Sequence, residues 1–446
     1  HHTHAVRPHR VGLAGFGKEG LVLGVDTEGS EDAPECVTLT ARHNEVACVE
    51  VHDGKRHPFL LPSLAHARAL VIHHAKHDFH VLHALGMQQM PRVDCTMLMA
   101  YLLGLPQSLK VLAYRELRYD MREYEDLIRP IDARQVRRAL REFWSANPEL
   151  PAVSRRALAS IRKITNTDTD KTPRQRWQAS TFAPLITLPP APTWKDAPEA
   201  DRVAYAMTDA VAHLRLYEKL WPRIQAEGLR QVYEIDRAVL PMLVRMEQIG
   251  MACDGEILRQ LSAEFSQELE RVLARLATIA GHPVNLNQHA AVSDFLFNEL
   301  GITPTKRTKT GFSTTQDKYL KARRQEHRAV ELVIEGRQLS KYIGTYTDKL
   351  PGLLRDGRYY PDWKYTRTPT GRLAEQIIVL MPKHSARGRR IRDAFHATDG
   401  HLLVSVDLSQ IELRVMAHVS RDAVLLKAFR DGVDLHAQVA HELLGG

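Results

Sequence analysis

The sequence predicts an α/β domain at its start, then a mostly helical unit, then a shorter segment that returns to strand and helix. Three observations predict this order. Apolar strand-like runs alternate with short helices over the first 120 residues, long amphipathic helices fill the middle, and an apolar run followed by a helix lies near residue 405. The chain has 446 residues, which is more than a single core needs.

The first elements alternate between strand and helix. GLVLGVDTEGS is typical of a buried strand that ends in carboxylates. ALVIHHAKHDFHVLHALG predicts a short strand followed by a helix, and DCTMLMAYLLG predicts a further helix with a small apolar face. Strands and helices of these lengths indicate an α/β layer.

Residues from about 130 to 200 differ from their surroundings because they are rich in arginine and then in proline. The proline-rich part predicts an ordered loop or connector. The arginine-rich part is either a solvated helix face or an arm that faces DNA. Amphipathic helices are then predicted in four stretches, the third of them ended by Gly281: DRVAYAMTDAVAHLRLYEKLWPRI, QVYEIDRAVLPMLVRMEQIGM, DGEILRQLSAEFSQELERVLARLATIAG and AVELVIEGRQLSKYIGTYTDKLP.

The composition excludes several classes of protein. Hydrophobic residues make up 44% and charged residues 26%, which excludes disorder as the main state. No apolar run approaches the ~20 residues of a membrane-spanning helix, and the start lacks a secretory signal pattern. The 4 cysteines form no Cys-x-x-Cys pair, so we expect no disulfide scaffold, no zinc site and a reducing, cytoplasmic location. The net charge of +8 favours a polyanionic partner, nucleic acid above all.

Two carboxylates, Asp26 and Glu28, lie at the end of the first predicted strand. Residues two apart in a strand point to the same face, so these side chains lie close together. Close carboxylates repel each other unless a cation lies between them. Two-metal phosphodiester chemistry uses this arrangement, with Mg²⁺ or Mn²⁺ ions about 3.5–4 Å apart and oxygen ligands.

Further ligands have to come from elsewhere in the chain. Asp78 is one candidate, and Tyr205 and Asp209 lie four residues apart on one predicted helix face. Asp209 would complete the metal shell, and the Tyr205 phenol would orient the attacking water. Each feature alone has a simpler explanation, such as a helix cap for Asp78. The three features in this order, each in the right local structure, favour the metal site.

These motifs resemble the three exonuclease motifs of the DnaQ-like (RNase H-like) 3′–5′ exonuclease superfamily, as found in family A DNA polymerases. VDTEGS is similar to the first motif, HHAKHDFHVL to the second and YAMTDA to the third. VDCTMLMAYLLG and SLKVLAYRELRYDMREYEDLI resemble the segments between them. The resemblance implies that Tyr205 positions the water and that two Mg²⁺ or Mn²⁺ ions are held by Asp26, Glu28, Asp78 and Asp209. His74 stands where the second motif often has Asn, and we expect tuning rather than loss of activity.

The helical middle resembles the thumb of family A (DNA polymerase I-like) polymerases in NLNQHAAVSDFLFNELGI, TKRTKTGFSTTQDKYL and IEGRQLSKYIGTYTDKL. The basic, hydroxyl-rich stretch TPTKRTKTGFSTT suits non-specific phosphate contacts, and its simpler explanation is a flexible surface loop. The candidate phosphate contacts are Lys306, Arg307 and Lys309.

An apolar strand over Leu402–Val406 is predicted to deliver Asp407 at its end, with a helix directly after it. DLSQIELR resembles motif A of family A DNA polymerases, usually DYSQIELR. The resemblance implies that Asp407 and the backbone carbonyl of Leu408 bind the catalytic Mg²⁺ ions. It also implies that Gln410 contacts substrate and that Glu412 excludes the 2′-hydroxyl of a ribonucleotide. Leu408 replaces the usual Tyr, a change that a backbone ligand tolerates.

The segments on either side of motif A resemble the same family. Downstream, DGVDLHAQVAHELLG is similar to GxDIHxxTA, which implies that His436 contacts the incoming triphosphate. Upstream, TPTGRLAEQIIVLMPKHSARGRRIRDAF is similar to the TGRL segment, although IIVLM replaces its polar residues. The resemblance implies a minor-groove contact by Arg372 and phosphate contacts by Lys383, Arg387, Arg389 and Arg390.

The resemblance implies a fold and a set of domains. We expect an RNase H-like 3′–5′ exonuclease domain followed by a helical thumb and a partial palm of a right-hand polymerase. The expected ranges are a tail at 1–12, the exonuclease domain at 13–225 with its arginine- and proline-rich insertion, the start of the palm and the thumb at 226–350, and the partial palm at 351–446. No 5′-nuclease domain precedes the exonuclease motifs in this sequence, so a phage-type member is expected. The RxxxKxxxYG and HDE motifs do not occur, so we expect this chain alone not to polymerise.

The expected partners are primer–template DNA, a single-stranded 3′ end, dNTP and a second chain that supplies the fingers and the rest of the palm, with no membrane. The expected location is the cytoplasm of a bacterial or phage-infected cell. Two alternatives stay open at this point. The chain could be a stand-alone 3′–5′ exonuclease, although DLSQIELR argues against it, or a non-catalytic DNA-binding subunit, although the exonuclease carboxylates argue against that.

Overall fold

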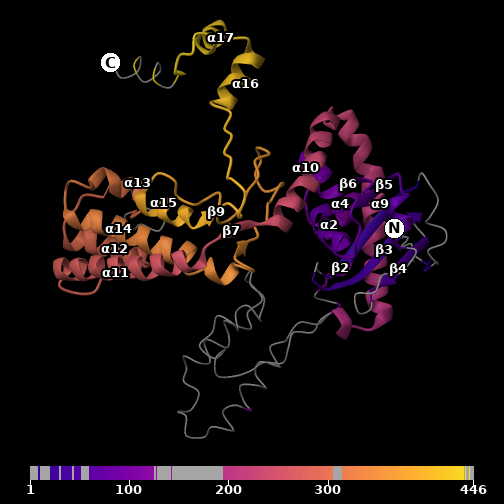
Figure 1. Ribbon diagram of the computed structural model, residues 1–446, viewed down its shortest axis with the longest axis horizontal. Coiled ribbons are helices and arrows are strands. Elements are labelled where there is room, and N and C mark those ends of the chain that lie inside the picture. Colours follow the sequence, from indigo (N-terminus) through magenta and orange to yellow (C-terminus); the bar gives the residue numbers. More distant parts are fainter. Residues whose placement is uncertain are drawn as a thin grey trace. The chain divides into compact units, whose positions relative to one another are not determined.

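The computed structural model describes residues 9–10, 21–29, 32–42, 45–51, 60–124, 127, 142, 194–304, 314–435, 437 and 441. The chain divides into two compact units (Figure 1). The first unit comprises His1–Gly250 with Tyr360–Leu380, and the second comprises Met251–Tyr359 with Met381–Gly446. The first division between the units falls at Gly250, and residues 360–380 return to the first unit. The expected domain ranges stay a prediction.

The first unit is built on a mixed six-stranded sheet in the order β1-β4-β3-β2-β5-β6. Strand β2 pairs antiparallel with β3 and parallel with β5, and β6 continues the parallel part. The strands are β1 (His9–Arg10), β2 (Val22–Gly29), β3 (Pro34–Arg42), β4 (Glu45–Glu50), β5 (Ala69–Ile72) and β6 (Arg92–Cys95). This sheet and its helices confirm the predicted α/β class.

The side chains of the central strands alternate between two apolar clusters. Val37 and Leu39 of β3 join the larger cluster, with residues of α2, α3 and α10. Cys36 of β3 joins a smaller cluster with Trp194 and the first half of α9. This period of two places one cluster on each face of the sheet. All 4 cysteines are free and buried, as expected for a chain without disulfides.

The helices of the first unit follow the predicted pattern. α2 comes directly after β5, α3 directly after β6, and the long α9 packs along β2 and β3. These helices are α1 (Leu60–Ala65), α2 (Ala75–Ala84), α3 (Thr96–Leu102), α4 (Leu109–Leu117), α9 (Glu199–Ala226) and α10 (Arg230–Ile249), with a 3₁₀ turn at Trp194–Asp196.

Residues 360–380 are fixed to the first unit by a buried ionic network. The Lys76 ammonium on α2 donates to Glu247 Oε1 at 2.5 Å, to Asp362 Oδ1 at 2.7 Å and to the Trp363 carbonyl at 2.7 Å. The Trp363 amide donates to Glu247 Oε1 at 2.6 Å, and His80 lies 2.8 Å from Glu247 Oε2. Lys76 and Glu247 are withdrawn from water whereas Asp362 is mostly exposed, so the Lys76 and Glu247 charges are the ones that depend on each other.

A second set of contacts continues along the returning segment. Tyr365 is buried, with its hydroxyl 3.5 Å from Cys95 Sγ. The Tyr101 hydroxyl donates to the Thr368 carbonyl at 2.7 Å and accepts from the Gly371 amide at 3.0 Å. The predicted TGRL segment therefore packs against α3 of the first unit.

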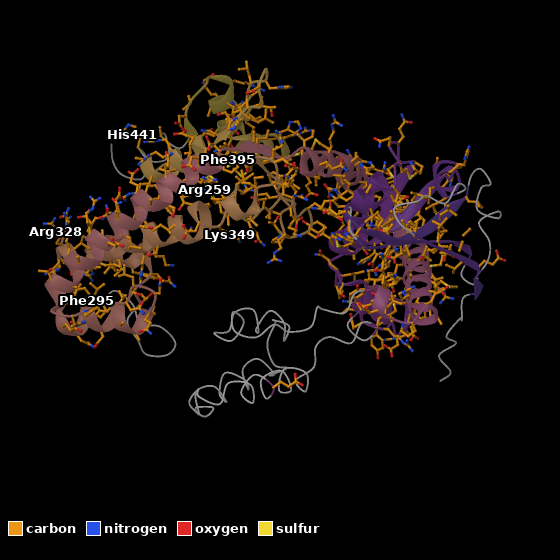
Figure 2. The ribbon with its side chains drawn as sticks, turned by 60° about the horizontal axis from the view of Figure 1, so that its bottom comes forward. Arg259, Phe295, Arg328, Lys349, Phe395 and His441 are labelled. Carbon is orange, nitrogen blue, oxygen red and sulfur yellow. The ribbon has the colours of Figure 1, made fainter. Side chains whose placement is uncertain are left out.

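The second unit is mainly helical. α11 and α14 form its longest pair and run in opposite directions, since Arg259 and Lys349 lie at one end and Arg328 at the other (Figure 2). The helices are α11 (Gly255–Ala280), α12 (His289–Ser293), α13 (Asp317–Leu320), α14 (Arg328–Tyr342), α15 (Ala386–Asp393), α16 (Ile411–Ser420) and α17 (Ala423–Arg430), with π-helical turns at Asp294–Glu299 and Ile343–Thr347 and 3₁₀ turns at Lys321–Arg323 and Pro351–Leu353. A small antiparallel sheet has the order β8-β7-β9, formed by β7 (Met251–Cys253), β8 (Arg358–Tyr359) and β9 (Phe395–His396).

The ends of α11 follow from its sequence. The Asp254 carboxylate accepts from the Glu256 amide at 2.8 Å and the Ile257 amide at 3.2 Å, so two otherwise unpaired amides are capped. Gly281 ends the helix in the left-handed conformation, with φ of 75°, which glycine adopts without strain. No helix among the described residues is both long and apolar enough to span a bilayer.

The predicted strand at Leu402–Val406 is wrong. The stretch between β9 and α16 is irregular, and Leu402 and Val404 are 88% and 81% exposed (Figure 1). A strand needs a neighbour to pair its amides and carbonyls, and among the described residues no strand pairs with it. The single helix predicted after it is present as two helices, α16 and α17, with a break at Arg421 and Asp422.

Replacing Lys76 with Met should destabilise the first unit, because Glu247 would stay buried without its cation. We expect the free energy of unfolding to fall by about 3–5 kcal/mol. Urea unfolding followed by tryptophan fluorescence measures this loss.

The matched control is Lys219→Met, which breaks a half-exposed pair with Glu116 in the same unit. That change should cost no more than about 1 kcal/mol. Equal losses for the two variants would contradict the stabilising role assigned to the buried network.

Candidate active site

Three carboxylates from two distant parts of the chain converge in the first unit. Asp26 and Glu28 lie on β2 and Asp209 lies on α9, and one oxygen from each falls within 4.8 Å of the others. The pleat of β2 points Asp26 and Glu28 to the same face, as the sequence predicts. The structure thereby brings together three of the four predicted acidic ligands.

A glycine permits this convergence. At Gly24 of β2, an added Cβ would lie 2.5 Å from the Ala210 carbonyl oxygen of α9. Because no other residue fits at this distance, Gly24 lets α9 approach the strand closely. Ala210 adjoins Asp209, so the same contact places the Asp209 carboxylate beside β2.

Asp78 lies next to this group but is held differently. Its Oδ1 accepts from the Thr27 amide at 3.0 Å and from the Thr27 hydroxyl at 2.8 Å. Thr27 stands between Asp26 and Glu28 in the strand, so α2 is tied to the strand at the acidic site. Asp78 is outside the group of three within 4.8 Å, although its charge still raises the pKa values of Asp26 and Glu28.

The carboxyl groups of this cluster have raised pKa values. Removal from solvent is the main cause for each of them, and mutual repulsion adds to it for Asp26 and Glu28. The pKa of Glu28 rises to about 8, that of Asp78 to about 7 and that of Asp209 to about 6. The pKa of Asp26 is raised well above its usual range. The metal-free cluster therefore holds protons at neutral pH.

Lys110 on α4 is a site residue that the sequence did not reveal. Its ammonium donates to Asp209 Oδ1 at 2.7 Å and to Oδ2 at 2.5 Å, and it lies 4.3 Å from the centre of the Tyr205 ring. A lysine on an amphipathic helix is ordinary, and the only signal was its place in the segment between the second and third motifs. Its positive charge lowers the pKa values of Asp26, Glu28 and Asp209.

Tyr205 lies one helical turn before Asp209, as the sequence predicts. The rings of Trp194 and Tyr124 meet it edge to face, with centroids 6.0 Å and 6.2 Å away. These contacts limit the rotation of the ring. Burial raises the pKa of the phenol, so it stays protonated at neutral pH and can donate a hydrogen bond.

The donor set fits a divalent cation of the Mg²⁺ type, which prefers carboxylate oxygens. Asp26 Oδ2 is buried and has no hydrogen-bond partner, so this oxygen is available to an ion. The neighbouring His213 side chain is neutral at neutral pH, because burial lowers its pKa to about 3. His213 Nδ1 lies 2.7 Å from the Val25 carbonyl, and its Nε2 lies 3.7 Å from Asp26 Oδ1.

The predicted polymerase residues are not gathered in this way. Asp407, Leu408 and Glu412 lie in the exposed part of the second unit, and Gln410 donates to Asp434 Oδ1 at 3.5 Å. Within the part of the chain that the structure describes, Asp407 joins no group of three possible metal ligands. Four of the predicted contacts lie outside the described residues: Lys306, Arg307, Lys309 and His436.

The arginines predicted to contact phosphate fall into two groups. Arg387 pairs with Glu268 and Glu335, at 2.6 Å and 2.7 Å, and Arg390 pairs with Glu264 at 2.6 Å. In this structure the guanidinium groups of these two residues bind carboxylates of α11 and α14, and their phosphate contacts stay a prediction. Arg372, Lys383 and Arg389 are exposed.

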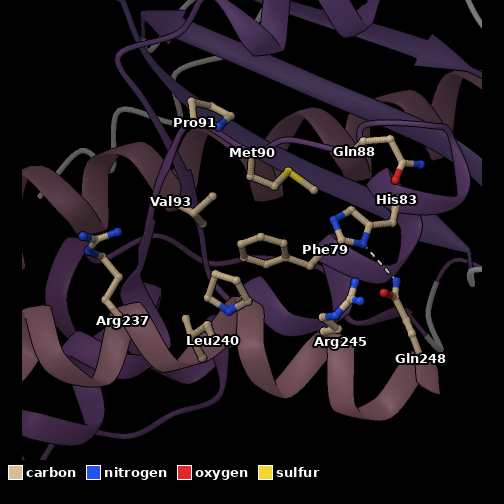
Figure 3. Close-up of a pocket in the computed structure, with 11 residues that line it drawn as sticks. Phe79, His83, Gln88, Met90, Pro91, Val93, Arg237, Leu240, Arg245 and Gln248 are labelled. Atoms are coloured by element: carbon tan, nitrogen blue, oxygen red, sulfur yellow. Dashed lines mark hydrogen bonds between the residues drawn. The ribbon is translucent and has the colours of Figure 1, made fainter. Parts of the chain in front are cut away.

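A separate pocket of about 320 Å³ lies between α2, the loop before β6 and α10. Figure 3 shows Phe79 on its floor, Met90 above it, and Arg237 and Arg245 toward opposite ends. Gln248 donates to His83 Nδ1 at 2.9 Å at the Arg245 end. None of the sequence-predicted site residues lines this pocket.

Comparison with known families gives two matches. Residues 14–140 match the family described as 3′-5′ exonuclease, and residues 255–446 match DNA polymerase family A. The chain is 42% identical over 236 residues to the thermostable DNA polymerase I of Thermus filiformis, which is 52% of this chain and 28% of that protein. It is 40% identical over 257 residues to the DNA polymerase I of Rhizobium leguminosarum, which is 56% of this chain and 25% of that protein.

A solved structure shares the fold. The POL domain of Pol1 from M. smegmatis, in complex with a DNA primer-template and dNTP, superposes with a TM-score of 0.70. The sequences are 24% identical, and the similarity covers 96% of this chain and 64% of that chain. The chain spans about a quarter of the length of the two bacterial polymerases named above, at 28% and 25%.

The raised pKa values predict how stability depends on pH. The folded carboxyls hold protons that the unfolded chain has already released, so the free energy of unfolding in EDTA should fall as pH rises from about 5 to about 8. Unfolding by urea at a series of pH values measures the fall. Mg²⁺ should reduce it, because the ion binds the ionised carboxylates.

The matched variant is Glu28→Gln, which removes one raised carboxyl from the cluster. Its stability in EDTA should vary less with pH than that of the original chain. A stability in EDTA that does not change over this range would contradict the raised pKa values.

Proposed function

Because residues 14–140 match the family described as 3′-5′ exonuclease and residues 255–446 match DNA polymerase family A, we propose that the acidic site of the first unit removes nucleotides from the 3′ end of single-stranded DNA. The convergence of Asp26, Glu28 and Asp209 carries this proposal. In a DNA polymerase, such an activity removes misincorporated nucleotides and so supports replication.

The residues at the site supply distinct functions. Asp26, Glu28 and Asp209 would hold a pair of Mg²⁺ or Mn²⁺ ions, and Asp78 would complete the shell from the Thr27 side. The chemistry that such ions would supply at these residues is activation of the attacking water and stabilisation of the leaving oxygen. The buried position of the carboxylates strengthens their attraction for the ions, since the local dielectric is low.

Tyr205 would orient the water that attacks the terminal phosphodiester. The phenol is protonated and its ring is fixed by Trp194 and Tyr124, so its hydroxyl points in a constant direction. A fixed donor or acceptor beside the attacking atom lowers the barrier by reducing the orientational entropy lost in the transition state.

For the second unit we propose a contribution to polymerisation. Asp407 and the Leu408 carbonyl would bind the catalytic ions, while Gln410, Glu412 and His436 would contact the incoming dNTP. The apolar stretch at Leu402–Val406 is exposed, as are several side chains of α16 and α17. This surface would pack against polypeptide that supplies the fingers and the rest of the palm.

The side chains proposed to contact DNA are basic, and the three of them that the structure describes, Arg372, Lys383 and Arg389, are exposed. Arg372 would reach the minor groove of the primer–template, Lys383 and Arg389 would contact phosphates, and Lys306, Arg307 and Lys309 would do so from the thumb. The proposed location is the bacterial cytoplasm, in a host or phage-infected cell.

Asp26→Ala should abolish the exonuclease. Purified chain with Mg²⁺ and a 5′-labelled single strand should shorten the strand from its 3′ end, and the variant should be slower by at least roughly 10²–10³-fold. Tyr205→Phe should retain ion binding and lose about a hundredfold in rate, since only the orienting hydroxyl is removed.

The control is Asp201→Ala, which removes an exposed carboxylate about two turns before Asp209 on α9. This variant should leave the rate unchanged. Metal-dependent binding without any shortening of the strand would favour a non-catalytic DNA-binding subunit. Shortening that survives Asp26→Ala would place the activity at another site and contradict the proposal.

A further inference from the structure

We propose that Lys110 is a built-in counter-ion of the exonuclease site: it occupies Asp209 while no divalent ion is bound, and it gives up that carboxylate when an ion binds. This inference rests on the function proposed above, because it assigns the ion site to the same carboxylates. The proposal adds Lys110, which lies outside the three motifs, to the site. It also states that the Lys110 ammonium competes with the ions for Asp209 and so sets how tightly the site binds them.

The geometry places the ammonium on both oxygens of one ligand. Lys110 Nζ lies 2.7 Å from Asp209 Oδ1 and 2.5 Å from Oδ2, and the side chain is mostly buried, at 12% exposure. Mg²⁺ binds a carboxylate oxygen at about 2.0–2.1 Å. An ion at Asp209 and the Lys110 ammonium would therefore compete for the same oxygens.

The charges at the site explain why a counter-ion is needed. Asp26, Glu28 and Asp209 place up to three negative charges within 4.8 Å, with Asp78 beside them. Lys110 is the cation that lowers the pKa of each of the three. One positive charge does not balance this cluster, so the metal-free site keeps raised pKa values and a strong attraction for a divalent ion.

The position of Lys110 also allows it to leave. It is the second residue of α4, and its stem of four methylene groups rotates freely compared with a guanidinium held in a fork. The face of Tyr205, 4.3 Å away, offers the ammonium a second, weaker site through a cation–π contact. Displacement from Asp209 therefore need not expose the charge to an apolar surface.

A purely structural function for Lys110 makes a different prediction. In that case the pair would fasten α4 to α9, and its loss would lower stability equally with and without metal. A counter-ion, by contrast, matters only while the ion is absent. The two functions are separated by measuring the stability of one variant in both conditions.

The test uses Lys110→Met in the full chain, with thermal unfolding in EDTA and in saturating Mn²⁺, and with Mn²⁺ affinity by calorimetry. In EDTA the melting temperature should fall by roughly 5 °C or more, because the carboxylates lose their cation. In Mn²⁺ most of that deficit should disappear. The variant should bind Mn²⁺ about tenfold more tightly, since the competing charge is gone.

Lys219→Met is the matched control, because it removes an exposed lysine that pairs with Glu116 at the surface of the same unit. It should change neither the metal dependence of the melting temperature nor the affinity. The proposal that Lys110 is a counter-ion would be overturned by either of two results. One is a loss in melting temperature of Lys110→Met that is equal in EDTA and in Mn²⁺, and the other is a Mn²⁺ affinity that is unchanged or weaker.

A different result bears on the underlying site. If the original chain binds no Mn²⁺ at all and Asp26→Ala has no effect on its melting temperature in Mn²⁺, the ion site itself is refuted, together with the counter-ion. If the original chain binds Mn²⁺ and loses it on Asp26→Ala, the site stands whatever Lys110→Met shows. The two proposals therefore fail on different observations.

Discussion

Three carboxylates held within 4.8 Å of one another repel each other, and this repulsion is the constraint on which the first unit depends. Removal from solvent strengthens it, and the resulting pKa of Glu28 is about 8. The fold keeps the groups together through close backbone packing and through hydrogen bonds to a neighbouring carboxylate. Gly24 admits α9 to the strand, and the two hydrogen bonds from Thr27 hold Asp78 on α2. A site assembled against its own electrostatics is well suited to bind divalent cations.

The same helix that carries Asp78 also fixes a remote part of the chain. Lys76, two residues before Asp78, binds Asp362 and the Trp363 carbonyl, which belong to the segment just before the motif A region. Glu247 precedes residues 251–359 of the second unit in the sequence, and Asp362 follows them. Lys76 on α2 of the first unit binds both carboxylates. The chain crosses between its units several times. Helix α2 carries both Asp78, beside the acidic site, and Lys76, which binds Asp362 and Trp363 of the segment that returns to the first unit.

Much of this site could be predicted from the sequence because its determinants are local. The alternation of β2 places Asp26 and Glu28 on one face, and helical spacing places Tyr205 one turn before Asp209. Other features depend on contacts between distant residues. Lys110 looks like any lysine of an amphipathic helix until α4 packs on α9, and the sequence does not reveal that Arg387 and Arg390 pair with carboxylates of α11. The predicted strand at Leu402–Val406 failed for a related reason, since its apolar sequence is suitable but no described strand pairs with it.

The convergence of carboxylates on a pair of ions is tested most directly by locating the ions. Crystals of the chain grown with Mn²⁺, measured at a wavelength where manganese scatters anomalously, would show them without reference to activity. The account predicts two anomalous peaks about 3.5–4 Å apart, in contact with Asp26, Glu28 and Asp209. Well-ordered carboxylates with no anomalous peak among them, in crystals that contain Mn²⁺, would contradict it.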